Sequence, residues 1–293
     1  MHIQDFNYHR PNTLEDAMNI LASSADAIPL AGGTDIMVEI NMGQRHHRDI
    51  VSLAGIAELK AIREDNGNLS IGAGATHSML IESLLVQERY TVIAEASRSI
   101  GTEQIRNIGT IGGNLCTGAS CCDTGPALIA LGATAELTSP EGMRNIAMKD
   151  FFINHKETAL QKGEIMTRIL VPAPLQGTGA GFVKFGYREA AAISVASVAV
   201  MLRTAGGICS DACVATGAVA PTPMISPGAT AEIKGRAVAD FKVDSVALRR
   251  VGEAAAEDAL PIDDIRGTVE YRRNLISTLT QRAVMKALQR IEK

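Results

Sequence analysis

The sequence contains no tryptophan and few other aromatic residues, with four tyrosines and six phenylalanines among its 293 residues. A core of this composition must consist mainly of Ala, Val, Ile, Leu and Met, which suits packed layers of helices and sheets. Hydrophobic residues make up 46% of the chain and charged residues 20%. These ordinary values argue against disorder and fibrous architecture, so we expect a folded globular protein.

The chain also lacks an excess of positive charge and any long hydrophobic run. Lys and Arg total 28 against 32 for Asp and Glu, a formal charge of -4, so the attraction that drives nucleic-acid binding is missing. The opening MHIQDFNYHR holds no signal-peptide core, and no later run approaches the roughly 20 apolar residues of a membrane span. We expect a cytoplasmic protein with no nucleic-acid partner and no membrane span.

Cysteine is scarce and odd in number, which favours reduced thiols over a disulfide framework. The five are Cys116, Cys121, Cys122, Cys209 and Cys213. An iron–sulfur site at the first three competes with simple packing, but adjacent cysteines fit the usual ligand spacings poorly. His46 and His47 stand between two arginines, which favours a solvated loop. We therefore expect packed thiols and no metal site.

Residues 1–55 have the pattern of a small β-α-β lobe. Thr13 and Asp16 resemble a capping box before apolar residues at helical spacing over 14–21. A short apolar run at 27–30 meets a glycine turn at 31–35, a helical face follows at 36–40, and 49–53 predicts a second strand. The lobe is too short to fold alone.

Residues 56–175 predict a second lobe. A strand at 69–73 precedes Thr76, a candidate helix cap, and 89–100 predicts a helix. The glycine-rich stretch 109–114 leads to Asp123, a candidate cap for the apolar segment 127–131. Two runs at 133–138 and 145–148 flank a turn and predict a hairpin, and 164–171 predicts one more strand.

Residues 176–293 predict a separate α+β unit. Pro172, Pro174 and the glycines at 177, 179 and 181 mark a composition shift, which we interpret as a domain boundary. Runs at 194–202 and 208–220 predict an antiparallel hairpin, and 243–259 and 268–291 have helical periodicity.

Two glycine turns, at 31–35 and 109–114, pair adjacent glycines with a small hydroxyl residue. Such turns let backbone N–H groups approach an anion, so they are candidates to hold a pyrophosphate. Neither matches a Walker motif or the Gly-x-Gly-x-x-Gly fingerprint. Taken singly, each is more often plain structure, and spacing alone leaves the ligand open.

Five segments resemble the FAD-binding (medium) subunit of the xanthine dehydrogenase, or molybdenum hydroxylase, family. They are LAGGTD at 30–35, QIRNIGTIGGNLCTGASCCDTGPALIALGA at 104–133, FVKFGYRE at 182–189, GAVAPTP at 217–223 and RGTVEYRRNL at 266–275. The resemblance covers nearly the whole chain. It implies an α+β fold: a two-lobed FAD-binding domain of the PCMH/vanillyl-alcohol-oxidase-like type, plus an α+β C-terminal domain with an antiparallel sheet and helices.

The resemblance implies that both turns hold FAD. The diphosphate is placed against Ala31, Gly32, Gly33, Thr34 and Asp35, with Leu30 lining the approach. The second turn, Thr110, Ile111, Gly112, Gly113 and Asn114, is expected to close over the same cofactor, with Ile105 and Asn107 just before it.

The resemblance also implies contacts along the rest of the cofactor. Asp123 matches an acid that hydrogen-bonds the sugar-alcohol portion of FAD. Ile169 or Leu170 matches an apolar position near the isoalloxazine, and Lys184 matches a basic residue that stabilises the reduced, anionic flavin. No side chain is expected to be catalytic, because the flavin ring carries the electron chemistry.

The implied function is an electron relay. Substrate is hydroxylated at molybdenum in a molybdopterin large subunit, electrons cross two [2Fe-2S] clusters in an iron–sulfur small subunit, and FAD hands a hydride to NAD. A dimer of heterotrimers is expected. We favour xanthine, purine or another nitrogen heterocycle as substrate. The alternatives are a carbon monoxide or acyl-CoA enzyme, quinone or oxygen as acceptor, and an assembly scaffold that has lost its flavin.

Overall fold

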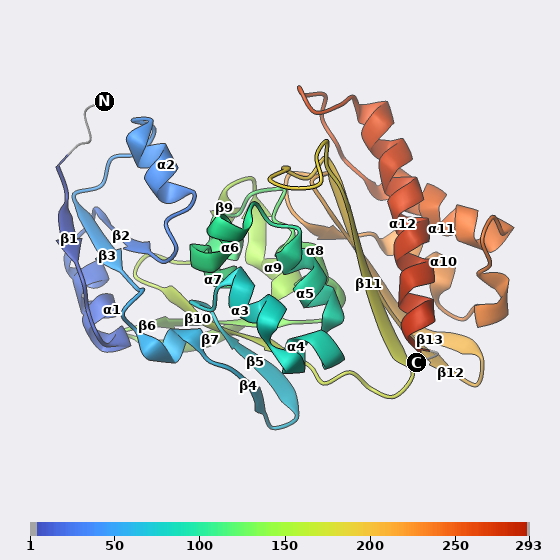
Figure 1. The fold of residues 1–293 in the computed structure, drawn as a ribbon, viewed down its shortest axis with the longest axis horizontal. Helices are drawn as coiled ribbons and strands as arrows, with labels where there is room; N and C mark the ends of the chain where they lie inside the picture. Colours follow the sequence, from blue (N-terminus) through green and yellow to red (C-terminus); the bar gives the residue numbers. More distant parts are fainter. Residues whose placement is uncertain (1–4, 292–293) are drawn as a thin grey trace.

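Three larger sheets follow one another along the elongated molecule in the computed structural model, which describes residues 5–291 (Figure 1). The N-terminal sheet lies at one end, a five-stranded sheet with its helices fills the middle, and a four-stranded sheet backed by long helices lies at the other end. No helix within residues 5–291 has the length and apolarity to cross a membrane.

The N-terminal sheet is parallel and has the order β1-β3-β2. Its elements are β1 (Asn7–His9), α1 (Leu14–Ser23), β2 (Ala27–Leu30), α2 (Ile36–Asn41) and β3 (Asp49–Ser52). The predicted cap of α1 is confirmed, because the Thr13 hydroxyl accepts from the Asp16 amide at 3.1 Å. The β-α-β pattern thus follows the sequence expectation and leaves the 31–35 turn between β2 and α2.

The middle sheet is antiparallel and has the order β4-β5-β10-β6-β7. Its strands are β4 (Ile62–Asp65), β5 (Asn68–Gly72), β6 (Thr134–Ser139), β7 (Gly142–Ala147) and β10 (Ile165–Val171). The predicted hairpin is confirmed as β6 and β7, joined at Ser139 and Gly142. Short elements complete this part: η1 (Ala57–Lys60), α9 (Met148–Phe151), β8 (Phe152–Asn154) and β9 (Glu157–Thr158).

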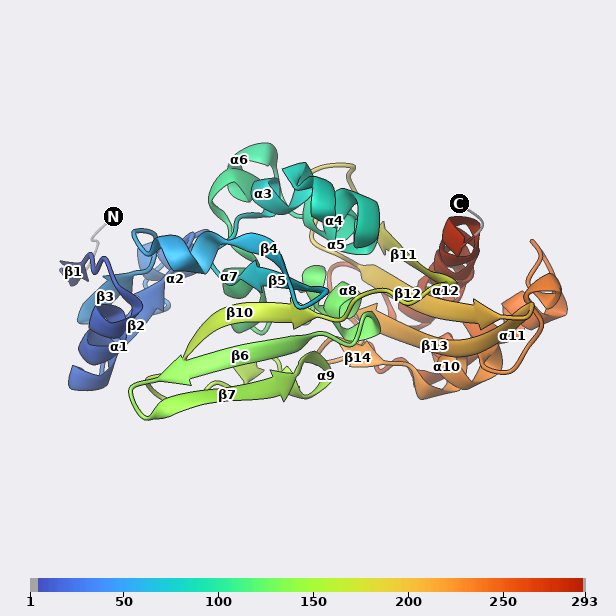
Figure 2. The ribbon, with the colours of Figure 1, turned by 90° about the horizontal axis from the view of Figure 1, so that it is seen from below.

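A run of short helices gathers on one side of the middle sheet (Figure 2). They are α3 (His77–Glu82), α4 (Leu84–Arg89), α5 (Thr91–Arg98), α6 (Glu103–Ile108), α7 (Ile111–Cys116) and α8 (Thr124–Ala130). Thr76, Thr102 and Thr110 cap three of them with side-chain hydrogen bonds. The helices and the sheet share one core of fully buried residues, which includes Leu69, Ile71 and Ile93.

The C-terminal sheet is antiparallel and has the order β11-β12-β13-β14. Its elements are β11 (Thr178–Phe185), β12 (Ala196–Ala205), β13 (Ile208–Gly217), β14 (Met224–Ile225), α10 (Pro227–Ile233), η2 (Val238–Asp240), α11 (Val246–Asp258) and α12 (Val269–Ile291). The predicted hairpin (β12 and β13) and the two predicted helices (α11 and α12) are confirmed. The sheet and its helices form a second core, while Phe182, Ala199 and Ala215 of the same sheet belong to the core of the middle sheet.

Of the glycines at 177, 179 and 181, which we interpreted as marking a domain boundary, the last two lie in strand β11, since residues 178–185 form that strand. Helix α12 packs directly on this strand. A Cβ atom at Gly179 would lie 2.1 Å from the Ala287 carbonyl oxygen, and one at Gly181 would lie 2.7 Å from that of Ala283. Glycine is thus required for close packing. The division into 1–55, 56–175 and 176–293 stays a prediction.

Candidate cofactor site

The two glycine turns contact each other where Gly32 lies against Ile108 and Gly109, a contact that we call the crossing. About 75 residues separate the two turns in the sequence. A Cβ atom at Gly32 would lie 2.0 Å from the Ile108 carbonyl oxygen and 2.9 Å from the Gly109 Cα atom. A Cβ atom at Gly109 would in turn lie 3.6 Å from the Thr34 hydroxyl oxygen. The crossing therefore requires glycine at position 32 and holds the N-terminal lobe against the loop between α6 and α7.

The first turn, at residues 31–35, contains backbone N–H groups without an acceptor in the described part of the chain. Within residues 5–291, the N–H groups of Gly32, Gly33 and Thr34 donate to no protein acceptor. Gly33 has φ 73°, a left-handed conformation that a side chain would strain. Unpaired amides in a turn of this kind form a concave donor set for an anion. The residues present thus fit a diphosphate at Ala31 to Asp35.

In the second turn, every amide except that of Thr110 is already used by the protein. The amides of Ile111 and Gly112 donate to the carbonyls of Ala75 and Ala73 at 2.9 and 2.8 Å. Those of Gly113 and Asn114 donate to the side-chain and carbonyl oxygens of Thr110, both at 3.0 Å.

The segment is therefore the capped beginning of α7, and its amides at 111–114 are bonded within the protein. Contacts of Thr110 to Asn114 with FAD stay a prediction. Gly112 serves packing, since a Cβ atom there would lie 2.6 Å from the Ala73 carbonyl oxygen. Among the amides of residues 110–114, that of Thr110 alone has no acceptor within residues 5–291. We infer that the second turn supports the first through the crossing at Gly32.

The side-chain oxygen of Asn114 is also occupied, by residues of the cysteine-rich loop. Its Oδ1 atom accepts from the Thr124 hydroxyl at 2.6 Å and from the Cys122 thiol at 3.1 Å. Burial raises the pKa of Cys122 and of Cys116 to about 12, so both stay protonated at neutral pH. All five cysteines are free, and no cluster of metal-ligating side chains occurs in the described part of the chain.

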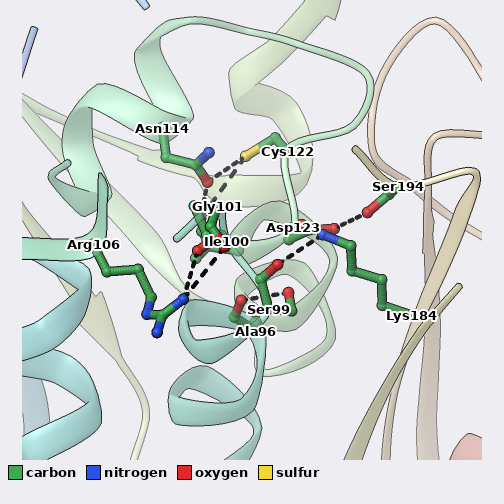
Figure 3. A network of polar contacts seen from close by, with 11 residues as sticks. Ala96, Ser99, Ile100, Gly101, Arg106, Asn114, Cys122, Asp123, Lys184 and Ser194 are labelled. Carbon is green, nitrogen blue, oxygen red and sulfur yellow. Dashed lines mark hydrogen bonds and ion pairs between the residues drawn. The ribbon is translucent and has the colours of Figure 1, made fainter. Parts of the chain in front are cut away.

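A buried ion pair links Asp123, at the start of α8, to Lys184 on β11 (Figure 3). The Asp123 Oδ2 atom accepts from the Lys184 ammonium at 2.6 Å, and its Oδ1 atom accepts from the Ser194 hydroxyl. Lys184 also donates to the Ser99 carbonyl at 2.9 Å. Burial raises the pKa of Asp123, and the Lys184 charge opposes that shift.

The ion pair bears on the expected roles of Asp123 and Lys184, and it corrects one of them. Asp123 does not cap α8 with its side chain, because both carboxylate oxygens face Lys184 and Ser194. Contacts of Asp123 with a sugar alcohol and of Lys184 with a flavin stay predictions. Ser194 is a further member that the sequence did not reveal, since a lone serine at the start of an apolar strand carries no recognisable signal.

A cavity of about 390 Å³ borders the ion pair. Its lining includes Ser99, Lys184, Phe185, Tyr187 and Arg188. The rings of Phe185 and Tyr187 meet edge to face with centroids 5.9 Å apart. Aromatic walls and two cations are a suitable lining for a planar, electron-rich ring.

The remaining predicted cofactor-binding residues differ in their exposure to solvent. Ile169 is fully buried in the core of the middle sheet and presents no surface to a cofactor, whereas Leu170 is half-buried. Ile105 is half-buried on α6. Asn107 is exposed, and its Oδ1 atom accepts from the Ser78 hydroxyl at 2.5 Å. Roles for Leu170, Ile105 and Asn107 in cofactor binding stay predictions.

His77 lies behind the crossing and was missed at the sequence level. Its backbone N–H donates to the Gly109 carbonyl at 3.0 Å, and its ring lies 3.6 Å from the position of a Cβ atom on Gly109. The side chain is 2% exposed, and its Nδ1 atom has no hydrogen-bond partner among the described residues. Burial, assisted by the Arg106 charge, lowers the pKa of His77 to about 4.

We expect the free energy of unfolding of the apoprotein to depend on pH through the protonation of His77. The unfolded chain takes up the proton near pH 6.5 and the folded chain only near pH 4, so stability falls as the pH falls through this window. The shift corresponds to a loss of about 3 kcal/mol. Urea unfolding of His77→Gln should show a pH dependence flatter by about that amount; identical slopes for parent and variant would refute the assignment.

Comparison with known proteins gives two family matches. Residues 4–174 match the FAD binding domain in molybdopterin dehydrogenase, and residues 182–287 match the CO dehydrogenase flavoprotein C-terminal domain. The chain is 35% identical over 286 residues to the carbon monoxide dehydrogenase medium chain of Afipia carboxidovorans, covering 97% of each. It is 31% identical over 284 residues to the xanthine dehydrogenase FAD-binding subunit of Escherichia coli O157:H7, covering 96% of each.

A solved structure of carbon monoxide dehydrogenase from Hydrogenophaga pseudoflava superimposes with a TM-score of 0.93 at 32% identity, covering 99% of both chains. The sequence similarity and the fold similarity therefore extend over the same, nearly complete length.

Proposed function

Because the chain belongs to the FAD-binding medium subunits of the molybdenum hydroxylase family, which includes xanthine and carbon monoxide dehydrogenases, we propose that it binds FAD at the 31–35 turn and serves as an electron relay. The observation that carries this placement is the set of unpaired N–H groups at Gly32, Gly33 and Thr34 beside the crossing. FAD, when bound, supplies the hydride and electron chemistry.

The residues of this chain bind and orient the cofactor. The 31–35 turn donates hydrogen bonds to the diphosphate, and the crossing with Gly109 keeps that turn in place. Lys184 keeps a positive charge at the wall of the 390 Å³ cavity, where the charge favours extra electron density on a bound ring. Asp123 and Ser194 hold Lys184 in that position.

We further propose that electrons enter from [2Fe-2S] clusters of an iron–sulfur small subunit and leave to NAD, with a molybdopterin large subunit as the site of hydroxylation. The support is that relatives carry the names medium chain and FAD-binding subunit. A dimer of heterotrimers in the cytoplasm is the assembly we propose.

For the substrate of the complex we propose xanthine or another nitrogen heterocycle, with carbon monoxide or an acyl-CoA as the alternative. The identities of 31% to the xanthine enzyme and 35% to the carbon monoxide enzyme are too similar to separate these choices. Co-purification of the tagged chain with its native partners, followed by assay of the complex with xanthine and with carbon monoxide, decides between them.

Titration of the purified apoprotein with FAD tests the cofactor proposal. We expect one equivalent to bind, with the visible absorption of oxidised flavin. Added NADH should then bleach the bound flavin under anaerobic conditions. A folded protein that stays colourless in excess FAD would favour the scaffold alternative, and a bound flavin that resists NADH would reject NAD as acceptor.

A further inference from the structure

The turn between α5 and α6 presents three successive carbonyls to two cations. The Ser99 carbonyl accepts from Lys184 at 2.9 Å, and the carbonyls of Ile100 and Gly101 accept from one guanidinium nitrogen of Arg106 at 3.1 and 3.4 Å (Figure 3). The Gly101 carbonyl also accepts from the Ala191 amide at 3.1 Å. The turn therefore joins β11, α6 and the 186–193 loop.

Arg106 has no role in the FAD contacts described above, although it lies within the QIRN part of a segment singled out by sequence. It is half-buried, and no carboxylate within residues 5–291 forms an ion pair with it. It donates to backbone carbonyls just beyond the end of α5, where carbonyls gather partial negative charge. Arg106 thus holds the backbone of the turn between α5 and α6 in position.

The same turn leads directly into the crossing. Gly101 has φ 50°, and a Cβ atom there would lie 2.9 Å from Cγ2 of Ile105, so the turn lies tightly on α6. Helix α6 ends at Ile108, whose carbonyl contacts Gly32. One end of this connected segment therefore lies against the free amides, and the other lies against the loop that lines the cavity.

We propose that Arg106 is a positioning residue that couples the diphosphate end of the cofactor site to its ring end. By holding the carbonyls of Ile100 and Gly101, it sets the distance between the Gly32–Gly109 crossing and the 186–193 loop. The inference rests on the proposed FAD site and concerns a residue that does not itself contact the cofactor.

The test uses Arg106→Ala and Arg106→Lys in the full chain, with Arg249→Ala as the matched control. Arg249 is an exposed arginine on α11 that likewise donates to a backbone carbonyl, that of Asp244. For each protein we would measure the FAD dissociation constant, the visible circular dichroism of the flavin at saturation, and the melting temperature without FAD.

We expect Arg106→Ala to weaken FAD binding by about 10- to 100-fold, the value of one or two charged hydrogen bonds, and to alter the flavin dichroism even at saturation. Guanidinium ion, at concentrations too low to denature, should restore both. Arg106→Lys should retain an intermediate affinity with an altered dichroism, and Arg249→Ala should match the parent.

The proposal is overturned if Arg106→Ala binds FAD as the parent does, or if the melting temperature falls while the dichroism stays unchanged and guanidinium has no effect. Where the alanine variant does not fold, parent-like affinity and dichroism in the lysine variant overturn it equally. Failure of the parent chain to bind FAD would instead reject the proposed function.

Discussion

Gly32→Ala is expected to weaken FAD binding by roughly 10- to 100-fold, the range that corresponds to an overpacking penalty of about 1–3 kcal/mol. The added methyl group would lie 2.0 Å from the Ile108 carbonyl oxygen. This oxygen and the next neighbours, the Ile108 carbonyl carbon and the Gly109 Cα atom, all belong to the backbone. A rotamer change therefore cannot relieve the clash, and the two turns must separate. Separation displaces the free amides of the 31–35 turn from the diphosphate. Calorimetric titration with FAD measures the loss.

Gly55→Ala is the matched control. It is also a glycine without positive φ, and its added methyl group would meet its nearest neighbour, the Pro11 carbonyl oxygen, at 3.2 Å. We expect it to bind FAD nearly as the parent does. Equal affinities for Gly32→Ala and Gly55→Ala would mean that the crossing has no part in cofactor binding.

Lys184→Met is expected to lower the free energy of unfolding at pH 7 by about 3–5 kcal/mol, because it leaves the Asp123 carboxylate buried without its cation. Burial already raises the pKa of Asp123, and loss of Lys184 raises it further. A raised folded-state pKa means that the penalty applies above that pKa and disappears as the carboxyl group becomes protonated at lower pH. The deficit should therefore shrink on acidification.

Adding Asp123→Asn to Lys184→Met should recover much of the lost stability, since the double variant buries no uncompensated charge. Urea unfolding of the parent, both single variants and the double variant gives the coupling energy directly. Additive losses at pH 7, or a deficit that does not change with pH, would contradict a buried ion pair between these residues.

The sequence predicted the regular elements well because their signals are local. The Thr13 cap, the β6–β7 hairpin and the two long C-terminal helices each depend on residues within a few positions of one another. The family resemblance placed the 31–35 turn and the segment at 104–133 in one site, and the contact of Gly32 with Ile108 and Gly109 brings these segments together.

What the sequence did not reveal depends on contacts between distant residues. Two adjacent glycines look alike in both turns, yet the amides of 111–114 are used by Ala73, Ala75 and Thr110, while those of 32–34 are free. The sequence marks Gly179 and Gly181 only as a composition shift, whereas the folded chain shows that they allow α12 to pack closely on β11. Only the folded chain brings Ser194 to Asp123.

Hydrogen exchange of the apoprotein with and without FAD shows whether the 31–35 turn binds the diphosphate. The amides of Gly32, Gly33 and Thr34 lack acceptors in the protein, whereas those of Gly112 and Gly113 are already bonded. We expect FAD to slow exchange strongly in peptides that cover 31–35 and to change those covering 111–114 little. Unchanged exchange at 31–35 on saturation with FAD would show that the diphosphate is bound elsewhere.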